Sequence, residues 1–194
     1  MTSEPLAALE ELAEVLDRLR IPFVVGGSLA SGAWGEPRST HDVDILVRLG
    51  PESISPLVDA LAGRFYVDEG AVADAVSGAA AFNVIHLKQF QKIDVFVAGF
   101  GPLDQAQLAR PALRPLSPGS PRSYPVTAPE IVVLRKLDWY RRGGEVSDRQ
   151  WRDVLAVLRV QRGRLDLGAM EELAAAERLQ DLLRRALADA YGVP

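Results

Sequence analysis

The chain contains no cysteine among its 194 residues. Disulfide bonds, thiolate nucleophiles and zinc sites with thiolate ligands are therefore excluded. The chain also lacks the run of roughly 18 or more apolar residues that a membrane-spanning helix needs. Its first residues lack the basic start and apolar middle of a secretory signal peptide. We therefore expect a cytoplasmic protein with no membrane partner.

Positive charge is not in excess. The formal net charge is −4 and the isoelectric point is near 5.3, which argues against a general DNA-coating protein or a polybasic membrane binder. Residues 128–165 are the exception, because their nine basic and five acidic side chains give a net charge of +4. These charges fit solvated helix faces, which is the more common case, or a surface that faces a polyanion.

Apolar residues make up 48% of the chain and charged residues 25%, as in ordinary globular proteins. Apolar patterns predict strands and amphipathic helices in the first half of the chain and helices in the second. The expected strands are 23–25, 42–48, 81–87 and 92–98; the expected helices are 4–20, 28–34, 53–61, one starting near Thr127, one starting near Ser147, and 169–190.

The predicted fold class is therefore α/β (α+β), with a mixed-sheet lobe flanked by helices over residues 1–110. Residues 110–126 are rich in Pro, Ser and Arg and predict a linker or lobe boundary. A C-terminal helical lobe completes the second part, residues 111–194. The pattern of a hydroxyl followed three residues later by Glu or Gln predicts capping boxes at Thr127 and Ser147.

Two acidic residues interrupt an apolar strand. Asp42 and Asp44 lie in DVDILVR, and residues i and i+2 of a strand share one face, with Cβ atoms roughly 7 Å apart. Two carboxylates on a half-buried face repel each other, and a divalent cation relieves that repulsion. Asp94, in the later strand KIDVFV, is the candidate for a third carboxylate if the two strands are neighbours. The alternative is a solvent-facing edge without function.

Gly26-Gly27-Ser28 follows a short strand and opens a helix. Glycines let the backbone approach a ligand closely, and a helix N-terminus presents free amides to phosphate. The alternative is a plain tight turn in which Ser28 caps the helix. Neither a Walker A motif nor a GxGxxG motif is present.

Joined in this order, the two features resemble a known family. The stretch FVVGGSLASGAWGEPRSTHDVDILV resembles the signature of the nucleotidyltransferase superfamily. Within it, GEPRSTHDVD resembles the AbiEii-like branch, whose members include toxins of type IV toxin–antitoxin systems. The helical stretch PEIVVLRKLDWYRRGGEVSDRQWRDVLAVLRVQ is similar to the second lobe of that branch. The resemblance covers residues 4–190, with its strongest motif at 23–48.

The resemblance implies a metal-dependent enzyme that moves a nucleotidyl group from a nucleoside triphosphate (NTP) to a hydroxyl acceptor. The acceptor would be RNA such as tRNA, a protein or a small molecule, and a toxin-like member would have a cognate antitoxin. Mg²⁺ or Mn²⁺ would be the cofactor. The implied metal-binding and catalytic residues are Asp42, Asp44 and Asp94. The implied nucleotide-binding residues are Gly26, Gly27, Ser28, Arg38 and Lys136.

Several alternative interpretations of these residues remain open. The chain could instead be a non-catalytic nucleotide-binding or protein-interaction module that keeps the fold. Arg38 could equally support the loop before the acids. We interpret Asp148 and Asp153 as helix-cap and surface groups. We expect Trp139 and Trp151 to pack between helices, with base stacking as the less common alternative.

Overall fold

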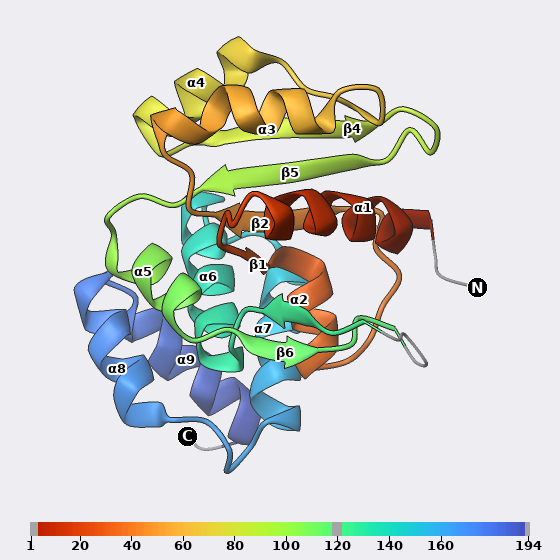
Figure 1. Cartoon of the computed structure of the whole chain (residues 1–194). Coiled ribbons are helices and arrows are strands. Elements are labelled where there is room, and N and C mark those ends of the chain that lie inside the picture. Colours follow the sequence, from red (N-terminus) through yellow and green to blue (C-terminus); the bar gives the residue numbers. More distant parts are fainter. Residues whose placement is uncertain (1–3, 118–121, 193–194) are drawn as a thin grey trace.

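The computed structural model describes residues 4–117 and 122–192 of the chain (Figure 1). Its α-helices are α1 (Glu4–Arg18), α2 (Gly27–Trp34), α3 (Ile54–Leu61), α4 (Glu69–Gly78), α5 (Pro102–Ala109), α6 (Pro129–Arg142), α7 (Asp148–Val160), α8 (Leu167–Ala176) and α9 (Gln180–Tyr191), with a short 3-10 helix, η1, at Pro51–Ser53. Its strands are β1 (Phe23–Val25), β2 (Val43–Val47), β3 (Phe65–Tyr66), β4 (Ala81–His86), β5 (Lys92–Val97), β6 (Ala112–Arg114) and β7 (Tyr124–Val126).

The strands form one mixed sheet in the order β3-β4-β5-β2-β1-β7-β6. The pairs β2–β5 and β1–β7 are parallel, and the remaining pairs are antiparallel. The central position of β2 matters most for function, because β2 lies between β1 on one side and β5 on the other.

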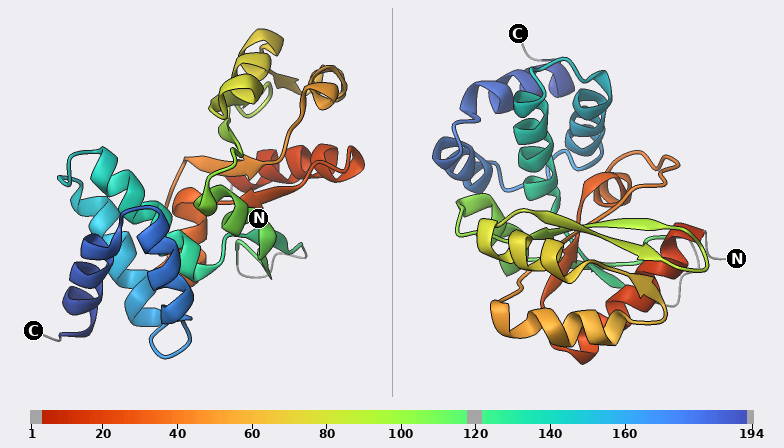
Figure 2. Two further views of the ribbon diagram at one scale, coloured as in Figure 1. Left: turned by 90° about the vertical axis from the view of Figure 1, so that its left-hand side faces the viewer. Right: turned by 90° about the horizontal axis from the view of Figure 1, so that it is seen from above.

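Alternating side chains give the central strands two different faces. On β5, Ile93, Val95 and Val97 are buried, whereas Asp94 and Phe96 on the other face are only half-buried. Helices α1, α3 and α4 cover the first face, and α2, α6 and α7 lie on the other side of the sheet (Figure 2). Of this second set, α2 contacts β2, and α6 and α7 pack against α2. Part of the second face on β5 and β4 remains accessible, since Asp94 and Phe96 are half-buried and Ala81 and Asn83 are exposed.

The C-terminal helices α6 to α9 pack against one another and against α2. Residues 169–190, which the sequence predicts as one helix, form most of two helices, and the chain reverses at Glu177–Leu179. Arg178 has a left-handed φ of 58°, and Leu179 is buried. Arg141 Nη1 donates to the carbonyl oxygens of Glu177 (2.8 Å) and Arg178 (3.1 Å), which stabilises the turn.

The four predicted strands, β1, β2, β4 and β5, begin and end within one residue of their predicted positions, whereas the two-residue strand β3 is absent from the prediction. Helices α4 and α5 are absent from the prediction, because each is short and only weakly amphipathic. The stretch 110–126 contains β6 and β7, which extend the same sheet; its residues 118–121 lie outside the described residues. No helix in the described part of the chain is both long and apolar enough to cross a membrane.

Candidate active site

The parallel pairing of β2 and β5 brings two of the predicted acids together. Asp44 lies directly opposite Asp94 in the strand register, and Asp42 lies two residues before Asp44, just ahead of β2. All three acids line one pocket of about 680 Å³, which also includes Gly26 to Ser28 and Lys136. The pocket therefore collects residues from the start of α2, from β2 and β5, and from α6.

Asp42 is exposed, whereas Asp44 and Asp94 are half-buried. Burial raises the pKa of the Asp44 carboxyl, and the negative charges of Asp94 and Asp42 raise it further. Among the described residues, no side chain donates a hydrogen bond to the Asp44 carboxylate. The other two acids contact basic side chains: Lys92 Nζ lies 2.8 and 2.9 Å from the Asp94 oxygens, and Arg149 Nη2 lies 3.4 Å from Asp42 Oδ2.

These acids fit a divalent cation by ligand type and by charge. Carboxylate oxygens are the ligands that Mg²⁺ and Mn²⁺ prefer, and Asp44 carries a negative charge that no neighbouring hydrogen bond offsets. Their arrangement is not yet a closed site, since no three acidic or histidine side chains of the described residues gather closely enough to hold a metal ion. Closing it would require Asp42 and Asp94 to turn away from Arg149 and Lys92.

The glycine turn lies directly against Asp44. Helix α2 begins at Gly27 with Gly26 as its N-cap, so Ser28 does not cap the helix. The Gly26 amide donates to the Asp44 carbonyl oxygen (2.9 Å). Gly27 has a φ of 55°, and a Cβ added there would lie 1.8 Å from Asp44 Oδ2. Both the backbone conformation and the close approach require glycine at position 27.

A buried chain of hydrogen bonds holds Val25, the residue that precedes this turn. Thr127 Oγ1 donates to the Val25 carbonyl oxygen (2.8 Å) and accepts from Gln107 Nε2 (3.0 Å). Gln107 Oε1 accepts from Arg135 Nε (2.7 Å), and Arg135 also pairs with Asp104. The predicted capping box at Thr127 is wrong, because this supporting role uses its hydroxyl and Ala128 is the N-cap of α6. Only half of the box at Ser147 forms: Ser147 Oγ accepts from the Gln150 amide (3.4 Å), whereas Gln150 Oε1 has no hydrogen-bond partner among the described residues.

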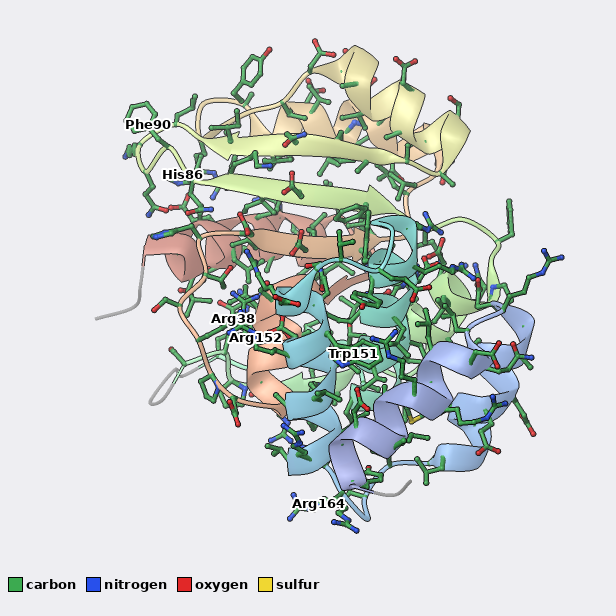
Figure 3. The ribbon with its side chains drawn as sticks, turned by 180° about the vertical axis from the view of Figure 1, so that it is seen from behind. Arg38, His86, Phe90, Trp151, Arg152 and Arg164 are labelled. Carbon is green, nitrogen blue, oxygen red and sulfur yellow. The ribbon has the colours of Figure 1, made fainter. Side chains whose placement is uncertain are left out.

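Basic side chains gather around the start of α2: Lys136 and Arg149 line the pocket, whereas Arg38 is not among its lining residues. Ser28 Oγ accepts from Arg38 Nη2 (2.5 Å) and from Arg149 Nη2 (3.1 Å). Lys136 is buried, and its Nζ donates to Asp153 Oδ2 (2.7 Å). Arg38 binds both oxygens of Asp153, each at 3.1 Å, and lies close to α2 and α7 (Figure 3).

Asp153 is not the surface group that the sequence suggests. Its side chain is 11% exposed and holds Arg38 and Lys136 together. Burial alone would raise the pKa of Asp153, but the hydrogen bonds from Arg38 and Lys136 outweigh it and lower the pKa. Burial lowers the pKa of Lys136 by more than its bond to Asp153 raises it. The sequence feature that could have indicated the burial of Asp153 is its position one helical turn before the fully buried Val157.

The tryptophans of the helical part differ from each other. Trp151 packs as expected, with its ring 5.0 Å from that of Tyr140 and its Nε1 donating to Asp189 (3.1 Å). Trp139 does not pack between helices, because 49% of it is exposed and it lines the pocket. Its ring contacts Phe96 edge-on, at 6.1 Å between centroids.

The fold is that of the nucleotidyltransferases, as the sequence predicts. The chain resembles the solution structure of the antibiotic-resistance factor ANT(2'')-Ia, with a TM-score of 0.56 and 14% identity over 92% of this chain and 94% of that one. ANT(2'')-Ia in complex with adenylyl-2''-tobramycin gives 0.54 and 16% identity, covering 91% and 98%. An antigenic nucleotidyltransferase-like protein from Paracoccidioides brasiliensis gives 0.53 and 18% identity, covering 97% and 96%. No protein-family model and no curated protein sequence matches the chain.

Proposed function

We propose that the protein transfers a nucleotidyl group from an NTP to a hydroxyl acceptor, with a divalent cation. One observation carries the proposal: a single pocket combines Asp44 and Asp94 in register with the glycine turn and with the basic side chains Lys136 and Arg149. The acids suit a cation, and the turn and the basic side chains suit a triphosphate. An NTP with its bound cation supplies both the cation for the acids and the triphosphate for the turn and the basic side chains.

Each group has a role in this proposal. The amides of Gly27 and Ser28 and the hydroxyl of Ser28 bind the β- and γ-phosphates at the start of α2, where the helix dipole also favours negative charge. Lys136 and Arg38 contact the triphosphate when they exchange Asp153 for phosphate oxygens. Arg38 also holds the loop before the acids through Ser28 and Asp153.

The chemistry is an in-line displacement at the α-phosphorus. The acceptor oxygen forms a bond to phosphorus, and the bond from phosphorus to the α,β-bridging oxygen breaks. Pyrophosphate leaves with that electron pair, and the hydroxyl proton passes to the Asp94 carboxylate. Mg²⁺ or Mn²⁺ bound by Asp42, Asp44 and Asp94 would supply positive charge for the attacking and leaving oxygens.

The identity of the acceptor is a finer proposal. ANT(2'')-Ia has been solved with an adenylylated tobramycin, which supports a small-molecule hydroxyl as acceptor on this fold. The resemblance of GEPRSTHDVD to the AbiEii-like branch supports RNA such as tRNA, or a protein, with a toxin-like role and a cognate antitoxin. Growth arrest on expression that depends on Asp44 would favour the toxin-like role. We also propose the division into lobes 1–110 and 111–194, with the site between them.

The test is transfer of label from α-³²P-NTPs, with Mg²⁺ or Mn²⁺, to total tRNA, to proteins and to small-molecule extracts. We expect wild type to label at least one pool and the Asp42→Ala/Asp44→Ala variant to label none. The matched control is Asp59→Ala/Asp74→Ala, which removes two exposed carboxylates from α3 and α4 and should label like wild type. Identical labelling by the wild type and the Asp42/Asp44 variant would contradict catalysis at this site.

A second candidate function is nucleotide binding without transfer. It is favoured by the contacts of Lys92 with Asp94 and of Arg149 with Asp42, which hold two of the three acids apart from a cation site. Calorimetry separates the two candidates. Mg²⁺-dependent NTP binding with no labelled pool would select the second, and the absence of any NTP binding would reject both.

A further inference from the structure

The order of strands in the sheet places the parts of the pocket in a line. The glycine turn follows β1, Asp44 is on β2, and Asp94 and Phe96 are on β5. Adjacent strands are about 4.8 Å apart, so the turn and the β5 side chains flank Asp44 on opposite sides. The basic side chains Lys136 and Arg149 belong to the turn side, where they contact Asp153 and Ser28.

The β5 side has a different character. Phe96 lies two residues after Asp94 on the same strand face, and the Trp139 ring stands against it. The exposed residues Ala79 to Ala81 border the same part of the pocket, and Ala81 pairs with Phe96 across β4 and β5. We call Phe96, Trp139 and Ala79 to Ala81 the aromatic shelf. The shelf is a half-exposed, mostly apolar surface inside an otherwise charged pocket.

In an in-line displacement, the leaving group and the attacking oxygen lie on opposite sides of the α-phosphorus, and therefore on opposite sides of the pocket. The leaving pyrophosphate occupies the glycine-turn side, where the amides and basic groups lie. The attacking oxygen must then approach the α-phosphorus from the opposite side, which is the side of Asp94 and the aromatic shelf. The shelf therefore faces the part of the acceptor that carries the hydroxyl, and the NTP base has no need to reach it.

We propose that the acceptor presents its hydroxyl on, or next to, a ring whose flat face stacks on Trp139. This inference rests on the proposed function, and it names the substrate class of that same site. An indole face binds flat, weakly polar ring surfaces through dispersion and its quadrupole. The Arg142 guanidinium lies over one face of the Trp139 ring, 5.9 Å from its centroid, and lines the same pocket. Ala79 to Ala81 border this part of the pocket with small side chains. Sugar rings and nucleoside bases share this chemistry.

The experiment follows the Trp139 indole N–H by NMR in the full ¹⁵N-labelled chain. The chain has three tryptophans, so the spectrum has few indole signals, and Trp139→Phe identifies the one of interest. The probes are methyl glucoside and uridine, with the open-chain polyol sorbitol as the control for hydroxyl groups without a ring. Each probe is titrated with and without Mg²⁺ and α,β-methylene-ATP.

We expect at least one ring probe to shift the Trp139 signal, sorbitol to leave it unchanged, and the nucleotide not to displace the ring probe. A response to methyl glucoside alone would indicate a sugar-type acceptor, and a response to uridine alone a nucleoside-type one. Trp139→Ala should weaken binding of that probe by about tenfold or more, as expected for one lost stacking contact; because the variant lacks the indole signal, its affinity is measured from saturation transfer to the signals of the probe itself. The matched control is Phe90→Ala, which removes an exposed aromatic ring on the β4–β5 loop, outside the pocket (Figure 3).

Three results would overturn the inference. Neither ring probe moves the Trp139 signal; sorbitol moves it equally; or the nucleotide alone moves it and expels the ring probe, which would make the shelf a site for the NTP base. A failure of the proposed function looks different, because then the nucleotide changes no signal near Gly27 and Ser28. In that case the shelf loses its role as an acceptor site even if a ring binds there.

Discussion

Replacing Gly27 with alanine tests whether the glycine turn and Asp44 act as one unit. Gly27 has a φ of 55°, and placing a non-glycine residue in that region costs roughly 1–2 kcal/mol. The new Cβ would also lie 1.8 Å from Asp44 Oδ2 and 2.8 Å from Asp44 Cβ, whereas real Cβ contacts essentially never fall below 3.0 Å. Rotating the carboxylate does not remove the second overlap, so the turn or the strand must shift.

That shift should damage function more than stability. Misplacing a reacting group by about 1 Å can cost on the order of a hundredfold in rate. We therefore expect Gly27→Ala to lower kcat for label transfer by about a hundredfold and to weaken NTP binding, while its free energy of unfolding falls by only about 2 kcal/mol. The measurements are urea unfolding, calorimetric titration with Mg²⁺–NTP, and the transfer assay.

Gly63→Ala is the matched control. Gly63 also has a positive φ, 79°, but nothing lies within 4 Å of a Cβ added there. This variant should show the backbone cost alone, roughly 1–2 kcal/mol of unfolding free energy, with unchanged NTP binding and transfer. The reasoning would be refuted if Gly27→Ala bound NTP and transferred label as well as Gly63→Ala does.

Two further predictions concern charge. Burial and the neighbouring acids raise the pKa of Asp44, so its ionisation costs stability as pH rises from the ordinary carboxyl pKa through the folded-state pKa. Asp44→Asn should therefore raise the unfolding free energy at pH 7 by about 0.5–2 kcal/mol while abolishing transfer. A loss of stability in urea unfolding would contradict this. Asp153→Asn should lower the unfolding free energy by about 3 kcal/mol, because it leaves Lys136 and Arg38 without their carboxylate. The lowered pKa of Asp153 gives the opposite sign: its contribution is present above the ordinary carboxyl pKa and is lost as pH falls through the folded-state value, so urea unfolding of the variant at decreasing pH should lack this part of the wild-type loss.

The strands β1, β2, β4 and β5, and the strand positions of Asp44 and Asp94, were predictable because they depend on local patterns. Asp44 and Asp94 each interrupt an alternating apolar strand, and the period of two assigns both side chains to a face without knowledge of the partner strand. The sequence does not show that β2 and β5 are neighbours, so the convergence of Asp44 and Asp94 depended on assuming it. The structure supplies it, since Asp44 and Asp94 are opposite each other in the register.

The surroundings of the glycine turn were not predictable in this way. Gln107, Thr127 and Arg135 come from three elements that are close only after the sheet has formed, and a short helix such as α5 gives little periodic signal. Asp153 is an acidic residue within a charged helix, where acidic side chains usually face solvent. Its contacts with Arg38 and Lys136 span 115 and 17 residues of sequence, so no local pattern contains them.

The pocket holds two half-compensated charges: Asp44 accepts no side-chain hydrogen bond from the described residues, and Lys136 is buried with Asp153 as its one acidic partner among them. Burial is the largest cause of both pKa shifts: it raises the pKa of Asp44, to which Asp94 and Asp42 add, and it lowers the pKa of Lys136. The two do not form a hydrogen bond with each other, because Lys136 Nζ is bonded to Asp153. A site built for stability would place uncharged residues at these positions. A ligand with negative oxygens for Lys136 and a cation for Asp44 compensates both charges at once, and a metal-bound triphosphate is such a ligand.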